Sequence, residues 1–171
     1  KPVPRPAMIA AVTDGAGVLQ GVHRTWLAPD GQDKAAVDTP RRAMGHLLGN
    51  AVRIALADQT LVLGEGIETM LSVREAAPSL PVWAALSSGH LGAVQLPAGL
   101  QRLYIAIDRD PAGQRAAERL TARATEVGIA VRVLEPRLGD FNDDLRAHGV
   151  EALRQHLAKQ IDLKDQHRLT I

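Results

Sequence analysis

The chain has 171 residues, 46% of them hydrophobic, and its 20 basic and 19 acidic side chains leave a net charge of +1. This is the size of one domain with a substantial core, and the near-neutral charge means that any contact with nucleic acid must come from a local patch. The absence of cysteine excludes disulfides and cysteine-ligated zinc, and no apolar run is long enough to span a membrane. We expect a globular cytoplasmic protein and, because the chain begins at Lys1, a piece of a longer one.

The first 58 residues are expected to form a small β-rich subdomain. Two apolar runs, at 7–12 and 18–27, are separated by a glycine-rich turn, a pattern typical of a β-hairpin. A polar, turn-rich loop at 28–40 carries Lys34. Arg41 and Arg42 follow, then a segment punctuated by glycine and a short predicted strand at 51–56.

From residue 59 to 171, strands and helices alternate. The predicted strands are 61–63, 82–86, 103–107 and 129–134, and the predicted helices are 67–77, 111–126 and 143–160. Apolar strands that alternate with helices indicate a mostly parallel sheet with helices on both faces. We therefore predict an α/β fold that a small β-hairpin subdomain precedes.

Two of the predicted strands end abruptly in carboxylates. One runs into Glu65 and Gly66, and another into Asp108 and Asp110. Ligands of open α/β sheets bind outside the carboxyl ends of the strands, so we expect these acids to lie together there. Their oxygens suit Mg²⁺ or Mn²⁺. Asp108 and Asp110, two residues apart on an extended backbone, can point to the same ion, although Asp110 before Pro111 equally fits a helix N-cap.

The pattern Glu65-Gly66-x-Glu68, followed by Asp108-x-Asp110-x-x-Gly113, resembles the Toprim domain shared by bacterial primases, topoisomerases, recombination-mediator proteins and one group of nucleases. The chain looks most similar to the primase-type Toprim modules of phages, plasmids and other mobile elements. The hairpin with its following lysine resembles the subdomain that precedes Toprim in primases, and residues 139–145 resemble a primase segment with an Asp before an Asn-Asp pair. The resemblance implies a Toprim-type, Rossmann-like fold.

The resemblance also implies an activity, namely primer synthesis on single-stranded DNA by metal-dependent nucleotidyl transfer. It assigns catalysis to Glu65, Asp108 and Asp110, and it adds Asp140 to these three as ligands for Mg²⁺ or Mn²⁺. The implied substrates are nucleoside triphosphates and a single-stranded DNA template. A helicase or a zinc-binding module in the parent protein would be a further partner, and no membrane is implied.

Five residues are candidates for contacts with the nucleotide or the DNA, because glycine admits close backbone approach and Arg and Lys bind phosphate directly. They are Lys34, Arg41, Arg42, Gly66 and Arg109. The alternative for each cation is a solvated charged loop, and the alternative for Gly66 is a tight turn between strand and helix.

Two other functions use the same acids or the same surface. A metal-dependent nuclease would activate water on a phosphodiester, and a non-catalytic module would bind DNA or a partner protein. A topoisomerase is disfavoured because the single tyrosine, Tyr104, lies inside a predicted buried strand. A nucleophile in the segment from Ser87 to His90 is disfavoured because no acid partner follows it in a triad-like order.

Overall fold

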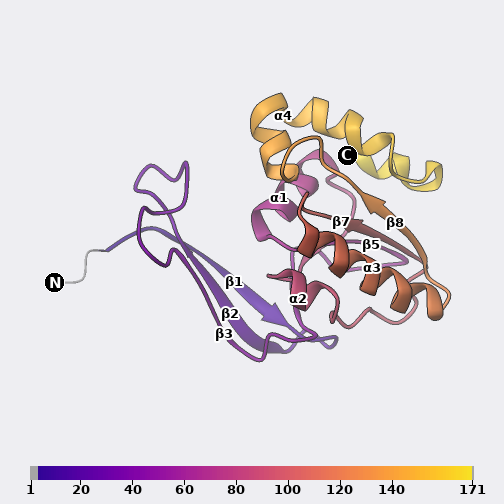
Figure 1. Ribbon diagram of the computed structural model, residues 1–171, viewed down its shortest axis with the longest axis horizontal. Helices are drawn as coiled ribbons and strands as arrows, with labels where there is room; N and C mark the ends of the chain where they lie inside the picture. Colours follow the sequence, from indigo (N-terminus) through magenta and orange to yellow (C-terminus); the bar gives the residue numbers. More distant parts are fainter. Residues whose placement is uncertain (1–3, 171) are drawn as a thin grey trace.

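The computed structural model describes residues 4–170 (Figure 1). Their strands form one eight-stranded sheet in the order β3-β2-β1-β4-β6-β5-β7-β8. The strands are β1 (Ala7–Thr13), β2 (Leu19–Trp26), β3 (Arg41–Gly45), β4 (Ala51–Arg53), β5 (Thr60–Gly64), β6 (Val82–Ala84), β7 (Arg102–Ala106) and β8 (Ala130–Leu134). The helices are α1 (Ile67–Ala76), α2 (Ser88–Leu91), α3 (Pro111–Glu126), α4 (Phe141–Ala158) and the 3₁₀ helix η1 (Leu163–Leu169).

The core is a parallel sheet with helices on both faces. Strands β6, β5, β7 and β8 are parallel neighbours, and every residue of β5 is buried, as the apolar runs of the sequence predict. Helices α1 and α4 pack side chains such as Met70 and Leu153 on one face, and α2 and α3 pack side chains such as Leu91 and Leu120 on the other. The α/β class is confirmed.

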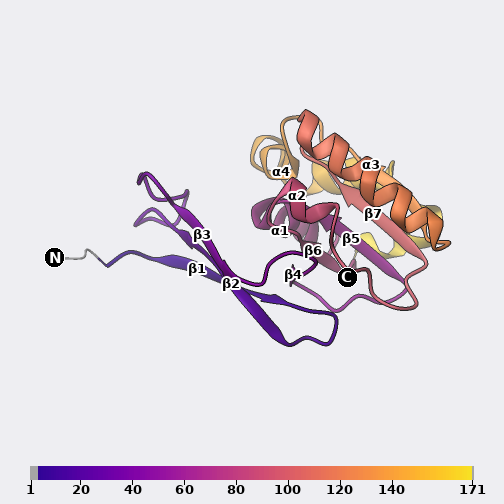
Figure 2. The same ribbon diagram turned by 60° about the horizontal axis from the view of Figure 1, so that its bottom comes forward.

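The N-terminal strands project from this core (Figures 1 and 2). The predicted hairpin is β1 and β2, and β3 adds to it as an antiparallel edge strand that the sequence did not predict. All five residues of β3 are exposed, so no alternation of apolar and polar residues marks it. Strand β4 joins these strands to the core, because it pairs antiparallel with β1 on one side and with β6 on the other. The sheet is therefore antiparallel from β3 to β6 and parallel from β6 to β8.

The sheet is continuous between the predicted subdomain, residues 1–58, and the predicted Toprim domain, residues 59–171. Strands from both sides of residue 58 belong to this one sheet, and the division into two units stays a prediction. Among residues 4–170 no helix is both long and apolar enough to cross a membrane.

Helix α4 begins earlier than predicted. Asp140 is its N-cap, since the carboxylate accepts the backbone N–H of Asp143 at 2.8 Å, and the helix therefore starts at Phe141 rather than at residue 143. The helix is kinked at Gly149, because this glycine has a φ of 79°.

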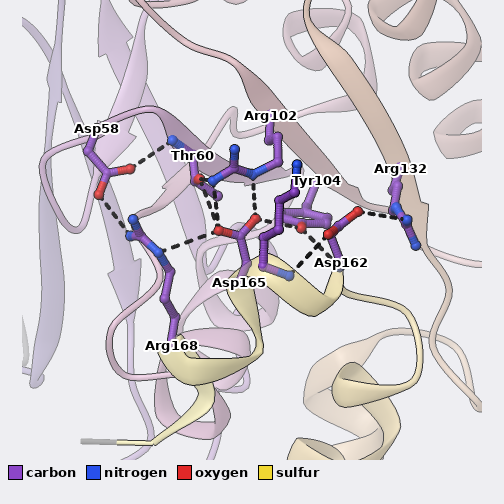
Figure 3. A network of polar contacts seen from close by, with 9 residues as sticks. Asp58, Thr60, Arg102, Tyr104, Arg132, Asp162, Asp165 and Arg168 are labelled. Atoms are coloured by element: carbon purple, nitrogen blue, oxygen red, sulfur yellow. Dashed lines mark hydrogen bonds and ion pairs between the residues drawn. The ribbon is translucent and has the colours of Figure 1, made fainter.

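The 3₁₀ helix η1 closes the far edge of the sheet, where the parallel strands begin (Figure 3). Its Asp165 is fully buried and accepts hydrogen bonds from Arg102 Nε at 2.6 Å and from the Tyr104 hydroxyl at 2.8 Å. Arg102 also donates to Thr60 Oγ1 at 3.0 Å. The last described turn of the chain is thus tied to the first residues of β5 and β7, opposite the edge that carries the acids.

Candidate active site

A cleft of about 660 Å³ lies at the carboxyl ends of β5 and β7, between the body of the fold and the loop after β2. Its volume is within the range of small-molecule sites. Three predicted acids line it: Glu65 follows β5, Asp108 follows β7 and Asp140 caps α4. Its other charged lining residues are Asp33, Lys34, Arg41, Glu68, Asp143 and Arg146. The topology therefore brings carboxylates from three loops to one edge of the sheet.

The turn that carries Glu65 depends on Gly64 at the end of β5. A Cβ on this glycine would lie 2.9 Å from the carbonyl oxygen of Ala106 and would clash with Met70 Sδ, so only glycine fits. The carbonyl oxygen of Glu65 accepts the N–H of Leu86 at 2.8 Å, and Leu86 holds a φ of 77°, which is rare for a residue with a side chain. The loop after β6 thus holds the Glu65 turn in place at a cost in backbone strain.

Asp108 is the most perturbed acid of the cleft. Its Oδ1 is buried and has no hydrogen-bond partner among the described residues. Burial, together with the charges of Glu65, Asp140 and Asp110, raises the pKa of the Asp108 carboxyl to about 7. The pKa of Glu65 is also raised, by burial and by the charge of Asp110. These carboxylates therefore repel one another in the absence of a cation.

Asp110 is the N-cap of α3, which is the alternative that its position before Pro111 allowed. Its Oδ1 accepts the N–H of Gly113 at 2.7 Å and caps α3. It does not line the cleft, although its charge acts on Glu65 and Asp108. A Cβ on Gly113 would lie 2.9 Å from the Asp108 carbonyl oxygen, so glycine allows this close contact between helix and loop. A role for Asp110 as metal ligand stays a prediction.

The donor set fits a divalent cation of the Mg²⁺ type. Within residues 4–170 no three acidic or histidine side chains form a ready-made metal cage. Mg²⁺ does not need one, because it usually takes one or two carboxylates and completes its shell with water and substrate phosphate oxygens. The unpartnered Oδ1 of Asp108, among repelling carboxylates, is the kind of oxygen that such an ion would satisfy.

The predicted phosphate-binding residues divide into two groups. Lys34, Arg41 and Gly66 line the cleft. Arg42 follows Arg41 on β3 and so points to the opposite face of the sheet. Arg109 is not among the lining residues, and its guanidinium donates to the carbonyl oxygen of Arg137 at 3.3 Å. The structure does not bring Arg42 or Arg109 to the cleft.

Several lining residues were not predicted as site residues, among them Glu68, Asn142, Asp143 and Arg146. Glu68 pairs with Arg41 at 3.2 Å. Asp143 and Arg146 follow the N-cap Asp140 at steps of three, which places them on one face of α4. Helical spacing from Asp140 would have predicted them if the start of the helix had been placed correctly.

Comparison with protein families gives two matches. A model of the Toprim domain matches residues 60–151, and a model of a domain of unknown function (DUF7146) matches residues 1–54. Comparison with curated proteins gives no match.

Comparison with solved structures gives primase folds. The primase fragment of the bacteriophage T7 primase-helicase protein has a TM-score of 0.65 at 16% identity, over 88% of this chain and 62% of that one. The Aquifex aeolicus primase has a TM-score of 0.62 at 18% identity, over 94% and 41%. A DNA primase domain from Pseudomonas aeruginosa has a TM-score of 0.58 at 20% identity, over 90% and 51%. The chain therefore spans roughly half the length of these structures, and at such identities the likeness shows the fold.

Proposed function

The chain belongs to the Toprim domain family, whose model matches more than half of its residues, and on that premise we propose that it is the catalytic core of a primase-like enzyme. Its reaction would be metal-dependent transfer of nucleotides to a primer on single-stranded DNA. The observation that carries the proposal is the buried Oδ1 of Asp108, which has no hydrogen-bond partner among the described residues and faces the charges of Glu65 and Asp140 at the carboxyl edge of the sheet.

Mg²⁺ or Mn²⁺ would be held by Asp108 and Glu65, with Asp140 and Asp110 close enough to add their charge. When bound, such an ion neutralises charge on the phosphates and polarises the phosphorus that is attacked. Its presence would also relieve the repulsion among the acids.

The chain's own residues would orient the reactants. Lys34 and Arg41 line the cleft and would bind the phosphates of the incoming nucleotide, while Gly66 at the start of α1 would let a phosphate approach the backbone. Glu65, which lines the cleft, would accept the proton of the primer 3′-hydroxyl as its oxygen attacks the α-phosphorus and pyrophosphate leaves.

The DNA would meet basic residues on the projecting strands. Arg42 lies beside Arg24 across the β2–β3 pair, and Arg24 stacks on Trp26 with its guanidinium carbon 4.2 Å from the ring centre. A stacked guanidinium keeps its N–H edges available to phosphate. Because the bacteriophage T7 relative is a primase-helicase, we propose a helicase in the parent protein, and a zinc-binding module is proposed on the primase resemblance alone.

The test is primer synthesis by the purified protein on single-stranded DNA, with labelled nucleotides and Mg²⁺ or Mn²⁺. We expect products that disappear with EDTA and in Asp108→Asn, while Asp58→Asn, at the opposite edge of the sheet, keeps them. Retained synthesis in Asp108→Asn would contradict the proposal.

The alternatives are separated by leaving out nucleotides. Shortening of a labelled DNA strand under those conditions would identify a nuclease, which uses the same acids on a phosphodiester. Binding of DNA that survives both EDTA and Asp108→Asn, with no product in either assay, would identify a non-catalytic module.

A further inference from the structure

We propose that Arg146, on the second turn of α4, binds the β- and γ-phosphates of the nucleotide, opposite Lys34. This inference rests on the proposed function, because it adds a residue to the same cleft and specifies the substrate as a nucleoside triphosphate. It starts from the distribution of charge around the cleft.

The cations of the cleft differ in whether they are already paired. Three cationic side chains line it, and Arg41 is engaged by Glu68 at 3.2 Å. Among residues 4–170, neither the Lys34 nor the Arg146 side chain has an ion pair or a hydrogen bond. Two cations that approach one cleft from different elements are therefore available to an anionic ligand.

The backbone that carries Arg146 is firmly held. Asp144, in the turn before it, is 1% exposed and accepts the N–H groups of Arg137 and Leu138, both at 2.8 Å. Asn142 donates to Ser72 Oγ on α1 at 3.0 Å. These bonds fix the start of α4 against the body of the fold, so Arg146 is presented to the cleft by a rigid helix rather than by a mobile loop.

Arg146 lies beyond the acids along the helix. Asp140 caps α4, Asp143 follows in its first turn, and Arg146 comes one turn later on the same face. An ion held by the acids would offset negative charge near the reacting atom, and the remaining charge of a polyphosphate would have to be met by cationic side chains of the cleft. The Arg146 guanidinium, which lines the same cleft, can form two parallel hydrogen bonds to phosphate oxygens.

The cost of this contact is small because Arg146 is exposed and has no ion pair within residues 4–170. No existing salt bridge has to break, unlike at Arg41. Arg146 is thus expected to distinguish a triphosphate from a monophosphate rather than to bind the nucleoside.

The test compares the binding of ATP and AMP by isothermal titration calorimetry in the presence of Mg²⁺. The proteins are the wild type, Arg146→Ala, Arg146→Lys and, as matched control, Arg115→Ala, which removes an exposed arginine from α3 outside the cleft. Loss of charge-assisted hydrogen bonds should weaken ATP binding about tenfold or more in Arg146→Ala and leave AMP binding unchanged. The ATP affinity of Arg146→Lys should lie between those of the wild type and Arg146→Ala, and the ATP affinity of Arg115→Ala should equal that of the wild type.

The inference is overturned if Arg146→Ala binds ATP as tightly as the wild type does, or if the substitution weakens the binding of ATP and of AMP equally. It is also overturned if the wild type binds no ATP. Circular dichroism melts of all four proteins exclude loss of the fold as the cause. The proposed function is refuted by a different result. If the wild type prefers ATP to AMP, if this preference is lost in Arg146→Ala, and if the wild type makes no primer, then the polymerase activity is refuted and the role of Arg146 in binding is retained. A wild type that makes primer, with an Arg146→Ala variant of normal ATP affinity, refutes only the role of Arg146.

Discussion

Arg41 on β3 and Glu68 in the first turn of α1 form an ion pair at 3.2 Å, which joins the projecting strands to the body of the fold beside the cleft. The side chains are 46% and 29% exposed, and pairs this exposed contribute about 0–1 kcal/mol to stability. Its main effect is therefore to orient Arg41 toward the cleft.

Arg41→Ala should accordingly weaken ATP binding about tenfold with little change in the melting temperature, because a phosphate contact is lost and a weak surface pair is broken. Arg42→Ala removes the same charge from the opposite face of β3 and should leave ATP affinity unchanged. Calorimetric titration of both variants measures the difference, and equal effects would show that only the net charge of the strand matters.

The cleft should bind nucleotide only in the presence of a divalent cation. Six acids line it against three cations, so a polyphosphate meets excess negative charge unless an ion neutralises part of it. Titration of ATP into the wild type with EDTA should show no binding, and Mg²⁺ should restore it. Binding of equal strength in EDTA would mean that the acids are not part of the nucleotide site.

Asp108→Asn should stabilise the metal-free protein while it abolishes activity. The substitution removes a partly buried carboxylate whose charged form is disfavoured by burial and by three neighbouring acids. A gain of about 1 kcal/mol corresponds to a rise of roughly 2–4 °C in Tm for a chain of this size. Thermal melts should also show that Mg²⁺ stabilises the wild type but not the variant, whereas equal Mg²⁺ effects would place the ion elsewhere.

Asp165 should be the most sensitive residue of the far edge. It is buried and paired with Arg102 at 2.6 Å, and removal of one partner from a buried pair costs about 3–5 kcal/mol. Asp165→Asn should therefore unfold at clearly lower urea concentration. Asp58→Asn, which alters the half-exposed pair with Arg168 at 2.8 Å, should cost about 1 kcal/mol or less.

The contribution of Asp165 to stability has a defined pH dependence. Hydrogen bonds from Arg102 and Tyr104 outweigh burial and hold the pKa of the Asp165 carboxyl below its ordinary value. A lowered folded-state pKa means that the stabilisation is complete above the unfolded value and is lost as the pH falls below it. The difference in unfolding free energy between wild type and Asp165→Asn should be constant above about pH 5 and shrink below about pH 4. A constant difference down to pH 2.5 would contradict this.

The elements that carry the acids were predictable because local patterns mark them. Apolar runs that end in Glu65 or Asp108 define strands whose carboxyl ends meet at one edge, and Asp110 before Pro111 defines the start of α3. The predicted helix 111–126 has the bounds that the structure gives to α3.

The misses depend on contacts that no local pattern shows. Strand β3 is recognisable only from its pairing with β2, since its side chains are all exposed. Asp165 acquires its role from Arg102, which is 63 residues away. Arg42 and Arg41 are adjacent in sequence, and only the orientation of β3 decides which one reaches the cleft.

The central claim is that carboxylates from separate loops share one divalent ion in the cleft. Crystals of the protein grown with Mn²⁺ test it directly, because anomalous scattering locates the ion without reference to activity. The account predicts one strong anomalous peak in contact with the carboxylates of Asp108 and Glu65. Full Mn²⁺ occupancy at another site, with no peak beside Asp108, would contradict it.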